Sequence, residues 1–341
     1  MAPPTLEPAT AALLAAQGLG GIPFHLEPLS ASGNNRVFVV HCGDVRLVAK
    51  WYFHDAADTR DRLGAEYAFL QHAWSSGLRC VPRPLGKDTL AHVALYEYVQ
   101  GRQLFAHEVN AQVMQQAAQF FSALNSAQSR VAAVALPLAS EACFSVAAHF
   151  AMVDTRLVRL QGMPLDCDVD HAAAAFVVEL DKYWQSAKLR LARGCEKLGL
   201  DADKTVPTSE RCLSPSDFGF HNALFRPDGS LCFIDFEYAG WDDPAKTMGD
   251  FFSHPGVAVP RAYFEDFLAQ ALAPFDAVQG MTARVRLLEP ISQLKWCCII
   301  LNEFLPAAAR RRNFANPSND AIARKQLQLG KAISLFESLP Y

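Results

Sequence analysis

Three oxygen-bearing side chains occur close together in one stretch of this chain of 341 residues. Asp217 and Asn222 lie five residues apart, and Asp235 follows at the end of an apolar run. Carboxylate and amide oxygens suit a hard divalent cation such as Mg²⁺, which also takes phosphate and water ligands. Phosphoryl transfer needs such a cation, and it needs a carboxylate that orients the attacking hydroxyl and accepts its proton. We therefore interpret Asp217 as a catalytic base, and Asn222 and Asp235 as metal ligands.

A β-hairpin is the element that would bring these three residues together. The apolar segment 223–225 is followed by Arg-Pro-Asp-Gly-Ser and then by the apolar segment 231–235. Two apolar runs around a Pro-Asp-Gly turn predict a hairpin whose open end holds Asn222 and Asp235 beside Asp217. The alternative is that the three polar residues only cap turns.

Two motifs around these residues resemble the catalytic segment of the aminoglycoside phosphotransferase and choline kinase family. They are Ser-Asp-Phe-Gly-Phe-His-Asn at 216–222 and Ile-Asp-Phe-Glu-Tyr-Ala-Gly-Trp-Asp-Asp-Pro-Ala at 234–245. The resemblance implies a small-molecule kinase that uses ATP and Mg²⁺. It also implies an α+β, protein-kinase-like fold with two lobes: a small antiparallel β N-lobe with one helix, and a large, mainly helical C-lobe.

The chain departs from the family pattern at two places. Pro215 stands where the family loop, His-x-Asp-x-x-x-x-Asn, usually has His, and this change concerns the geometry of the loop. Lys246-Thr247-Met248 stands where Asp-Pro-Ala is usually followed by Tyr-Asp-Leu. Asp250 is the next carboxylate, and it either replaces the missing one or simply lies on a helix.

The first hundred residues read as a small antiparallel sheet. Apolar runs at 24–29, 36–40 and 45–51, separated by a loop and a Gly-Asp turn, predict a meander of three strands. Lys50 lies in the third strand, and Glu66 lies on a predicted helix at 56–77. The resemblance implies that Glu66 fixes Lys50 against the α- and β-phosphates of ATP; an exposed Glu66 is the alternative.

Two further segments are assigned to the nucleotide. The loop before the second strand contains Gly33 and Asn35, which tolerate unusual dihedrals and would let backbone N–H groups approach phosphates. A plain hairpin loop is an equal alternative. The strand at 92–99 resembles the connector between the lobes, which implies that the backbone at Glu97 and Val99 binds adenine. We place the N-lobe at residues 1–100 and the C-lobe at residues 101–341.

Helical periodicity dominates the C-terminal part of the chain. Helices are predicted at 111–128, 146–160, 176–198, 263–272, 282–305 with a kink at Pro290, and 318–335; a short helix is also predicted before Gly18. Tyr183 and Trp184 lie on the third of these. They offer either an aromatic wall for a cationic substrate or core packing.

Composition excludes several classes of function. Half of the residues are hydrophobic and the net charge is −4 without a long basic tract, so nucleic acid is not an expected partner. The run Arg310–Arg312 reads as a helix end. Nine cysteines without a C-x-x-C pair predict a cytoplasmic protein. The longest apolar run, 296–301, is far shorter than the ~20 residues that span a bilayer, so no membrane contact is expected. The oligomeric state is not indicated.

The acceptor is predicted to be a small molecule, because only eight residues lie between Asp235 and Pro244 and a peptide-docking platform needs more. The acidic residues Glu237, Asp242, Asp243 and Asp250 either attract an amine or cap turns and helices. We expect an ATP- and Mg-dependent phosphotransferase acting on a hydroxyl of an aminoglycoside-, choline- or sugar-like molecule. The alternative is a catalytically silent nucleotide-binding protein, which Pro215 and Thr247 motivate. A protein kinase is disfavoured.

Overall fold

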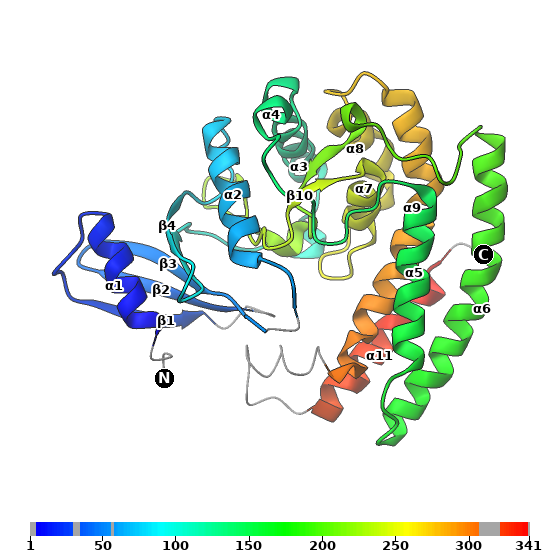
Figure 1. Cartoon of the computed structure of the whole chain (residues 1–341), viewed down its shortest axis with the longest axis horizontal. Coiled ribbons are helices and arrows are strands. Elements are labelled where there is room, and N and C mark those ends of the chain that lie inside the picture. The colour runs from blue at the N-terminus through cyan, green and yellow to red at the C-terminus, as the bar shows by residue number, and fades with distance from the viewer. Residues whose placement is uncertain (1–4, 30–34, 56–57, 307–320, 340–341) are drawn as a thin grey trace.

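A five-stranded antiparallel sheet forms one end of the molecule (Figure 1). The structure is a computed structural model that describes residues 5–29, 35–55, 58–306 and 321–339. The strands follow the order β1-β2-β3-β5-β4. Their bounds are β1 Phe24–Leu29, β2 Arg36–Cys42, β3 Val45–Trp51, β4 Pro84–Asp88 and β5 Val93–Glu97. The predicted meander of three strands is confirmed.

Each face of this sheet is covered by a helix. Helix α1 (Leu6–Ala16) contributes Leu6 and Leu14 to a buried cluster with Ala49. Helix α2 (Arg62–Ser75) contributes to a second cluster, which includes Ala94 on β5. Successive strand residues point to opposite faces, so Lys50 lies on the face of α2. The sheet therefore carries two helices: the one expected in the N-lobe, and the short helix predicted before Gly18, which is α1.

Helix α2 begins later than predicted, at Arg62 instead of near residue 56. Asp61 is its N-cap, and the Asp61 side chain accepts a hydrogen bond of 2.8 Å from Gly64 N. A capping carboxylate satisfies one of the unpaired N–H groups of the first turn. This cap fixes the start of the helix that carries Glu66.

Helices form most of the remaining chain. In Figure 1, the long helices α5, α6, α9 and α11 lie side by side at the end opposite the sheet, and α3, α4, α7 and α8 lie between. Their bounds are α3 Ala111–Leu124, α4 Ala127–Ala132, α5 Val146–Gln161, α6 Asp168–Lys197, α7 Pro244–Ser253, α8 Phe264–Ala271, α9 Val278–Ile300 and α11 Ala321–Glu337. Short 3₁₀ turns lie at Ala106–Glu108, Thr208–Glu210, Phe220–Asn222, Arg261–Tyr263 and Leu301–Phe304.

The predicted helices are present, with different ends. Helix α6 begins eight residues before Phe176, at Asp168, and α9 continues through Pro290 as one helix. Trp184 belongs to the core. It is 1% exposed, and its Nε1 donates a hydrogen bond of 2.7 Å to Asp154. Of the two interpretations of Trp184, core packing is confirmed, and an aromatic wall for a substrate is not formed by this residue.

Two small sheets frame the segment with the candidate catalytic residues. The predicted hairpin is confirmed as β8 (Ala223–Phe225) and β9 (Leu231–Phe233), and β6 (Arg102–Gln103) pairs with its outer edge. The other sheet pairs β7 (Cys212–Ser214) with β10 (Gly240–Asp242). Both ends of the segment are thus held by strand pairing.

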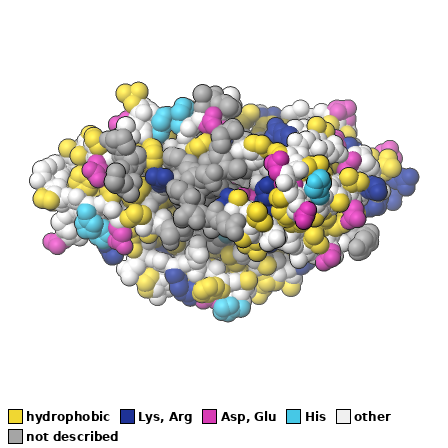
Figure 2. All heavy atoms as spheres, turned by 90° about the horizontal axis from the view of Figure 1, so that it is seen from below, with side chains coloured by type: hydrophobic (Ala, Val, Ile, Leu, Met, Phe, Trp, Pro, Cys, Tyr) yellow, Lys and Arg dark blue, Asp and Glu magenta, His cyan; other side chains and the backbone are white. Residues whose placement is uncertain are grey.

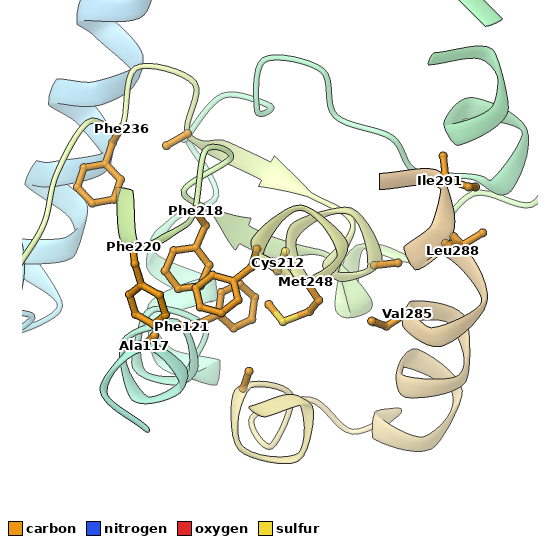
Figure 3. Close-up of a cluster of buried hydrophobic side chains, with 14 of the residues drawn as sticks. Ala117, Phe121, Cys212, Phe218, Phe220, Phe236, Met248, Val285, Leu288 and Ile291 are labelled. Carbon is orange, nitrogen blue, oxygen red and sulfur yellow. The ribbon is translucent and has the colours of Figure 1, made fainter. Parts of the chain in front are cut away.

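An aromatic cluster packs beneath the same segment (Figure 3). Phe218, Phe220 and Phe236 point into the interior, next to side chains from α3 and α7. Phe218 packs on Phe251 with ring centroids 4.6 Å apart, and Phe236 packs on Phe69 of α2 at 4.8 Å. Because these rings alternate with the polar residues of the segment, burying them directs the polar side chains the other way.

Surface charge and the state of the thiols are two further features of the molecule. On the face shown in Figure 2, Lys and Arg side chains are dispersed among hydrophobic and acidic ones. No helix in the described part of the chain is long and apolar enough to cross a membrane. All nine cysteines are free thiols, and seven of them are buried.

Candidate active site

Lys50 lies at the centre of a cluster of buried charges. Its Nζ donates hydrogen bonds to Glu66 Oε2 at 2.7 Å and to Asp235 Oδ1 at 2.6 Å. The hydroxyl of Tyr52 also donates to Glu66, at 2.8 Å. Burial favours the neutral amine, but the charges of Asp235 and Glu66 outweigh it and raise the pKa of Lys50 well above its usual value. The predicted pairing of Lys50 with Glu66 is confirmed, so Glu66 is not an ordinary exposed carboxylate.

Asp235 is held in an unusual backbone conformation. Its φ is 65°, in the left-handed region that costs a residue with a side chain about 1–3 kcal/mol and that is typical of functional sites. Burial raises the pKa of Asp235 to about 6, with Lys50 opposing this shift and the negative charges of Glu237 and Glu66 adding to it. A second cation beside Asp235 would therefore be favourable.

Asp217 and Asn222 contact each other directly. The Asn222 side chain donates from Nδ2 to the backbone oxygen of Asp217 at 3.0 Å and to Asp217 Oδ2 at 3.2 Å. The backbone oxygen of Asn222 accepts from Ile234 N at 2.9 Å, so Asn222 lies beside the strand that leads into Asp235. The segment thus brings the three predicted residues to one place.

Two histidines flank Asp217 and were not predicted. His221 and His254 stack with ring centroids 3.4 Å apart, and their Nε2 atoms lie 3.3 and 3.6 Å from Asp217 Oδ1. Burial favours a protonated carboxyl, but His221, His254 and Asn222 outweigh it and hold the pKa of Asp217 well below its usual range. Asp217 is therefore ionised at neutral pH, as a base must be.

The local backbone selects the tautomer of His254. Its Nδ1 accepts a hydrogen bond of 2.9 Å from Gly256 N, so in the neutral ring the proton is on Nε2, facing Asp217. Burial and the neighbouring His221 lower the pKa of His254 to about 3. A Cβ at Gly219 would come within 2.8 Å of the His221 ring, and a Cβ at Gly256 would come within 3.0 Å of the His254 ring, so both glycines leave space for the histidine pair.

The neighbourhood of Pro215 shows how the loop is fixed without the usual histidine. Ser214 Oγ accepts from Ser216 N at 2.9 Å and from Thr247 Oγ1 at 2.8 Å. Thr247, the residue that departs from the family pattern, thus anchors the loop to α7. Ser216 has a φ of 65°, a second left-handed residue close to Asp217.

Asn35 and Glu237 form a contact between the sheet and the catalytic segment. Asn35 Nδ2 donates to Glu237 Oε2 at 2.6 Å, and its Oδ1 accepts from Phe53 N at 3.0 Å. Arg62 Nε lies 3.6 Å from the same Glu237 oxygen. The buried Asn35 side chain thus joins the loop to Glu237; Gly33 lies outside the described residues.

The connector residues are placed at the end of β5. Glu97 pairs with Leu47 of β3, and its N–H donates to the backbone oxygen of Arg83 at 2.9 Å. The Glu97 side chain is exposed, and Val99 is half-buried just beyond the strand. A role in binding adenine stays a prediction for both residues, and the N–H of Glu97 already has its acceptor.

The acidic residues after the hairpin are buried and paired with cations. Asp243 accepts from Arg284 Nε and Nη2 at 2.9 and 2.6 Å, and it caps α7 through Ala245 N. Asp242 lies 3.0 Å from Lys246 Nζ, and Lys295 binds Asp250. The capping interpretation is confirmed for Asp243, while Asp242 and Asp250 belong to ion pairs.

A cavity of about 270 Å³ opens beside Asp217. Residues from α5, α7 and α9 line it together with Asp217 and His254. Most of these residues were missed in the sequence, because nothing in a helical stripe marks a residue that faces a cavity. Of the two histidines at Asp217, only His221 could have been found from the sequence, because it follows Asp217 by four residues and directly precedes Asn222.

The oxygen ligands fit a divalent cation. The side-chain nitrogen of Asn222 donates to Asp217, which leaves its carbonyl oxygen for a cation. Asp235 is surrounded by the negative charges of Glu66 and Glu237. A carboxylate and an amide oxygen beside a lysine match the way Mg²⁺ is held when phosphates supply its other ligands.

Solved structures share this fold over almost the whole chain. A choline/ethanolamine kinase family protein from Mesorhizobium loti aligns with a TM-score of 0.60 and 19% identity, covering 98% of this chain and 95% of that one. Spectinomycin phosphotransferase APH(9)-Ia, solved with ADP and spectinomycin, aligns with a TM-score of 0.59 and 12% identity, covering 96% and 98%. An ethanolamine kinase from Plasmodium vivax aligns with a TM-score of 0.59 and 12% identity, covering 93% and 83%.

These structures define the class of fold: it is α+β, two-lobed and protein-kinase-like, as predicted. The sequence model of the phosphotransferase enzyme family (APH) matches residues 25–277. The chain therefore belongs to the APH phosphotransferase family, in agreement with the resemblance found in its motifs. The comparison with curated proteins found no match.

Proposed function

We propose that this protein transfers the γ-phosphoryl group of ATP, with Mg²⁺, to a hydroxyl group of a small molecule. The observation that carries the proposal is the double contact of Lys50. It binds Glu66 on one side and Asp235 on the other, beside the Asp217–Asn222 pair. A lysine that is fixed by a helix carboxylate and faces a metal-binding aspartate is the arrangement by which kinases hold nucleotide phosphates.

Each residue has a role that its surroundings support. Asp217 accepts the proton of the acceptor hydroxyl, and its low pKa keeps it ionised. Lys50 neutralises charge on the α- and β-phosphates and is held in position by Glu66. Asn222 and Asp235 would hold Mg²⁺, which supplies charge neutralisation at the transferred group. Positioning and electrostatics provide most of the rate.

The nucleotide would lie between the sheet and the catalytic segment. We infer a boundary between an N-lobe of residues 1–100 and a C-lobe of residues 101–341, because β5 ends at Glu97 and β6 already pairs with the catalytic hairpin. The backbone at Val99, together with the loop containing Gly33 and Asn35, is the inferred nucleotide contact. Related structures with bound ADP support nucleotide binding.

The cellular location is inferred from the thiols. All nine are free, and burial raises the pKa of several of them, for example Cys143 to about 12. Such residues behave as small apolar side chains and fit a reducing compartment. We infer a cytoplasmic protein.

The test is an assay of ATP consumption with a panel of hydroxyl compounds in the presence of Mg²⁺. We expect Asp217→Ala and Asp235→Ala each to lower kcat by at least about a hundredfold. The matched control is Asp228→Ala, which changes an exposed carboxylate in the turn of the same hairpin and keeps full activity. Full activity of Asp235→Ala would contradict the metal assignment.

The alternative, a silent nucleotide-binding protein, predicts a different combination of thermal stability and turnover. It would be stabilised against heat by Mg-ATP, yet it would turn over no acceptor and hydrolyse no ATP. Pro215 motivated this alternative. The loop contacts of Ser214 and the two histidines at Asp217 supply positioning without the usual histidine, which favours the enzyme.

A further inference from the structure

Four basic side chains line the cavity beside Asp217. They come from separate segments: Arg60 precedes α2, Arg156 lies on α5, Lys246 lies on α7 and Lys295 lies on α9. Besides Asp217, the carboxylates that line the same cavity are those of Glu141 and Asp250. Bringing four cations from distant segments to one small space is unfavourable, because like charges repel, unless negative charges offset that repulsion.

The counter-charges of this cluster lie partly behind the wall. Lys246 is 3.0 Å from Asp242, a residue with 0% exposure that does not line the cavity. Arg60 binds Asp58 through its Nε at 2.7 Å, and Asp58 does not line the cavity either. The pairs hold the cations in place in the wall of the cavity.

Two buried donors in the wall have no acceptor in the described part of the chain. Arg156 is 8% exposed, and its Nε forms no hydrogen bond. The indole Nε1 of Trp296 is buried and unpaired as well. Leaving a buried donor without an acceptor is unfavourable. Both side chains line the cavity, but the two unpaired atoms themselves have almost no exposed surface, so they do not meet a ligand directly.

The pocket already stabilises one carboxylate of its own. Glu141 binds Arg156, and its φ of 142° is an unfavourable conformation for a residue with a side chain. Burial opposes ionisation of Glu141, but the charges of Arg156, Lys246, Lys295 and Arg60 outweigh it and lower its pKa. All four cations therefore favour a negative charge at this point in the cavity.

The pKa of Lys295 is shifted by the same cluster of cations. Burial, and the neighbouring cations Lys246 and Arg156, lower the pKa of Lys295, although Asp250 opposes the shift. An ammonium group has three donors, and its hydrogen-bond partner in the described residues is Asp250. An added anion would relieve the repulsion among these cations and use the remaining donors.

We propose that the acceptor carries a compact anionic group, a carboxylate or a phosphate, in addition to its hydroxyl. The hydroxyl lies at Asp217, and the anionic group lies against Arg156, Lys295 and Lys246. This inference rests on the proposed phosphoryl transfer and names the class of its acceptor. The volume of about 270 Å³ suits a small metabolite, since pockets for drug-sized ligands begin at about 300 Å³.

The same cluster disfavours the cationic acceptor considered from the sequence. An amine in this cavity would approach four fixed cations, and the carboxylates Asp242, Asp243 and Asp250 that suggested it are already paired. A like charge in a buried site is costly. Discrimination between an anionic and a cationic acceptor is therefore built into the wall of the cavity.

The experiment compares acceptors that differ in the anionic group alone. The pairs are serine with ethanolamine, glycerate with glycerol, and glycerol 3-phosphate with glycerol, each assayed with Mg-ATP. We expect kcat/KM to be at least about tenfold higher for an anionic member, because charge-assisted hydrogen bonds are the stronger ones. Preference for serine or glycerate identifies a carboxylate, and preference for glycerol 3-phosphate identifies a phosphate. Equal or better turnover of ethanolamine, choline or an aminosugar would overturn the proposal.

Variants connect the preference to the cavity. Arg156→Gln should raise KM for the anionic acceptor about tenfold or more, with KM for ATP unchanged, and Arg156→Lys should recover part of the loss. The matched control is Arg159→Gln on the exposed side of the same helix, which should change neither constant. Melting temperatures of all variants identify any that fail to fold. An unchanged KM for the acceptor in a folded Arg156→Gln protein contradicts the proposal.

Binding assays separate this proposal from the proposed function. Glycerate, glycerol and glycerol 3-phosphate are titrated into the full chain by calorimetry, with and without ADP. Anion binding that Arg156→Gln abolishes, without any turnover, supports the anionic pocket and contradicts the kinase. Turnover of uncharged or cationic acceptors alone supports the kinase and contradicts the anionic pocket. No binding and no turnover of any anionic compound contradicts the anionic pocket as well.

Discussion

Asp217 is held by groups from separate parts of the chain. Asn222 donates to it from the same loop, His221 lies beside it in that loop, and His254 reaches it from the segment after α7. A base that must meet a hydroxyl at hydrogen-bond distance gains from such fixation, because small displacements lower the rate steeply. The stacked pair of histidines therefore supports the orientation of the base.

We predict that His254→Ala lowers kcat about ten- to a hundredfold and leaves KM for ATP unchanged. The reason is that Asp217 loses the Nε2–H that faces it, whereas the contacts of Lys50 with the nucleotide are unaffected. Steady-state kinetics with varied ATP give both constants.

The control for this prediction is His171→Ala, an exposed histidine on α6, which should leave kcat and KM unchanged. A structural role of His254 alone would lower the melting temperature and the active fraction of the protein, with normal kcat per active molecule. That outcome would contradict a positioning role.

Residue types could be predicted where the chemistry has a fixed spacing. Asp217, Asn222 and Asp235 lie on one loop and hairpin, so this short segment alone brings their side chains together. Arg156 and Lys295 lie on helices 139 residues apart, and both sit within ordinary amphipathic patterns. Their position in the wall depends on how α5 packs against α9, which no local pattern encodes.

At the scale of elements, α7 and α9 form a close helix pair that carries both lysines of the cavity. Gly249 lies at the crossing, where a Cβ would come within 2.4 Å of Ser292 Oγ. The absence of a side chain allows the helices to approach. The spacing between Lys246 and Lys295 therefore depends on this glycine.

We predict that Gly249→Ala lowers the free energy of unfolding by about 1–3 kcal/mol, because it overpacks the interface. Chemical denaturation measures this change. The matched control is Gly280→Ala in the first turns of α9, where a Cβ meets nothing within 4 Å. This control should stabilise the protein by up to about 1 kcal/mol through helix propensity. Equal effects of the two substitutions would contradict a tight crossing.

Elements set by local sequence were predicted, whereas elements that depend on distant segments were not. Strands β1 and β3 match their expected ends, and the Gly43-Asp44 turn directly precedes β3. The two- and three-residue strands β6, β7 and β10 were not predicted, since they exist through pairing with distant segments. Helix α6 begins earlier than its apolar stripe, because the buried residues of its first turns are Asp170 and Ala173, which do not extend the pattern of large apolar side chains.

Across the whole molecule, buried ion pairs join segments that are remote in sequence. Asp243 after β10 binds Arg284 of α9 and lies 3.2 Å from His149 of α5. Burial opposes ionisation of Asp243, but His149 and Arg284 outweigh it and lower its pKa. A lowered carboxyl pKa stabilises the fold above the unfolded value of about 3.9, and this stability is lost as the pH falls through the folded value.

We predict that Asp243→Asn lowers the free energy of unfolding at pH 7 by about 3 kcal/mol, because it leaves Arg284 without its buried partner. The difference from the unmodified protein should be constant above about pH 4 and should shrink below it. Urea denaturation at pH 7, 5, 4 and 3 tests this. The exposed control Asp276→Asn should stay within about 0.5 kcal/mol. A deficit at pH 3 as large as the deficit at pH 7 would contradict the assignment.

Lys50 of the sheet binds Asp235 of the catalytic hairpin. The lysine thus acts as a built-in counter-ion for three clustered carboxylates, Glu66, Asp235 and Glu237. Loss of activity in a Lys50 variant therefore has two explanations: loss of a phosphate contact, or distortion of the site by repulsion among those carboxylates. Measuring the soluble yield and the circular dichroism spectrum of the variant together with its kcat distinguishes the two.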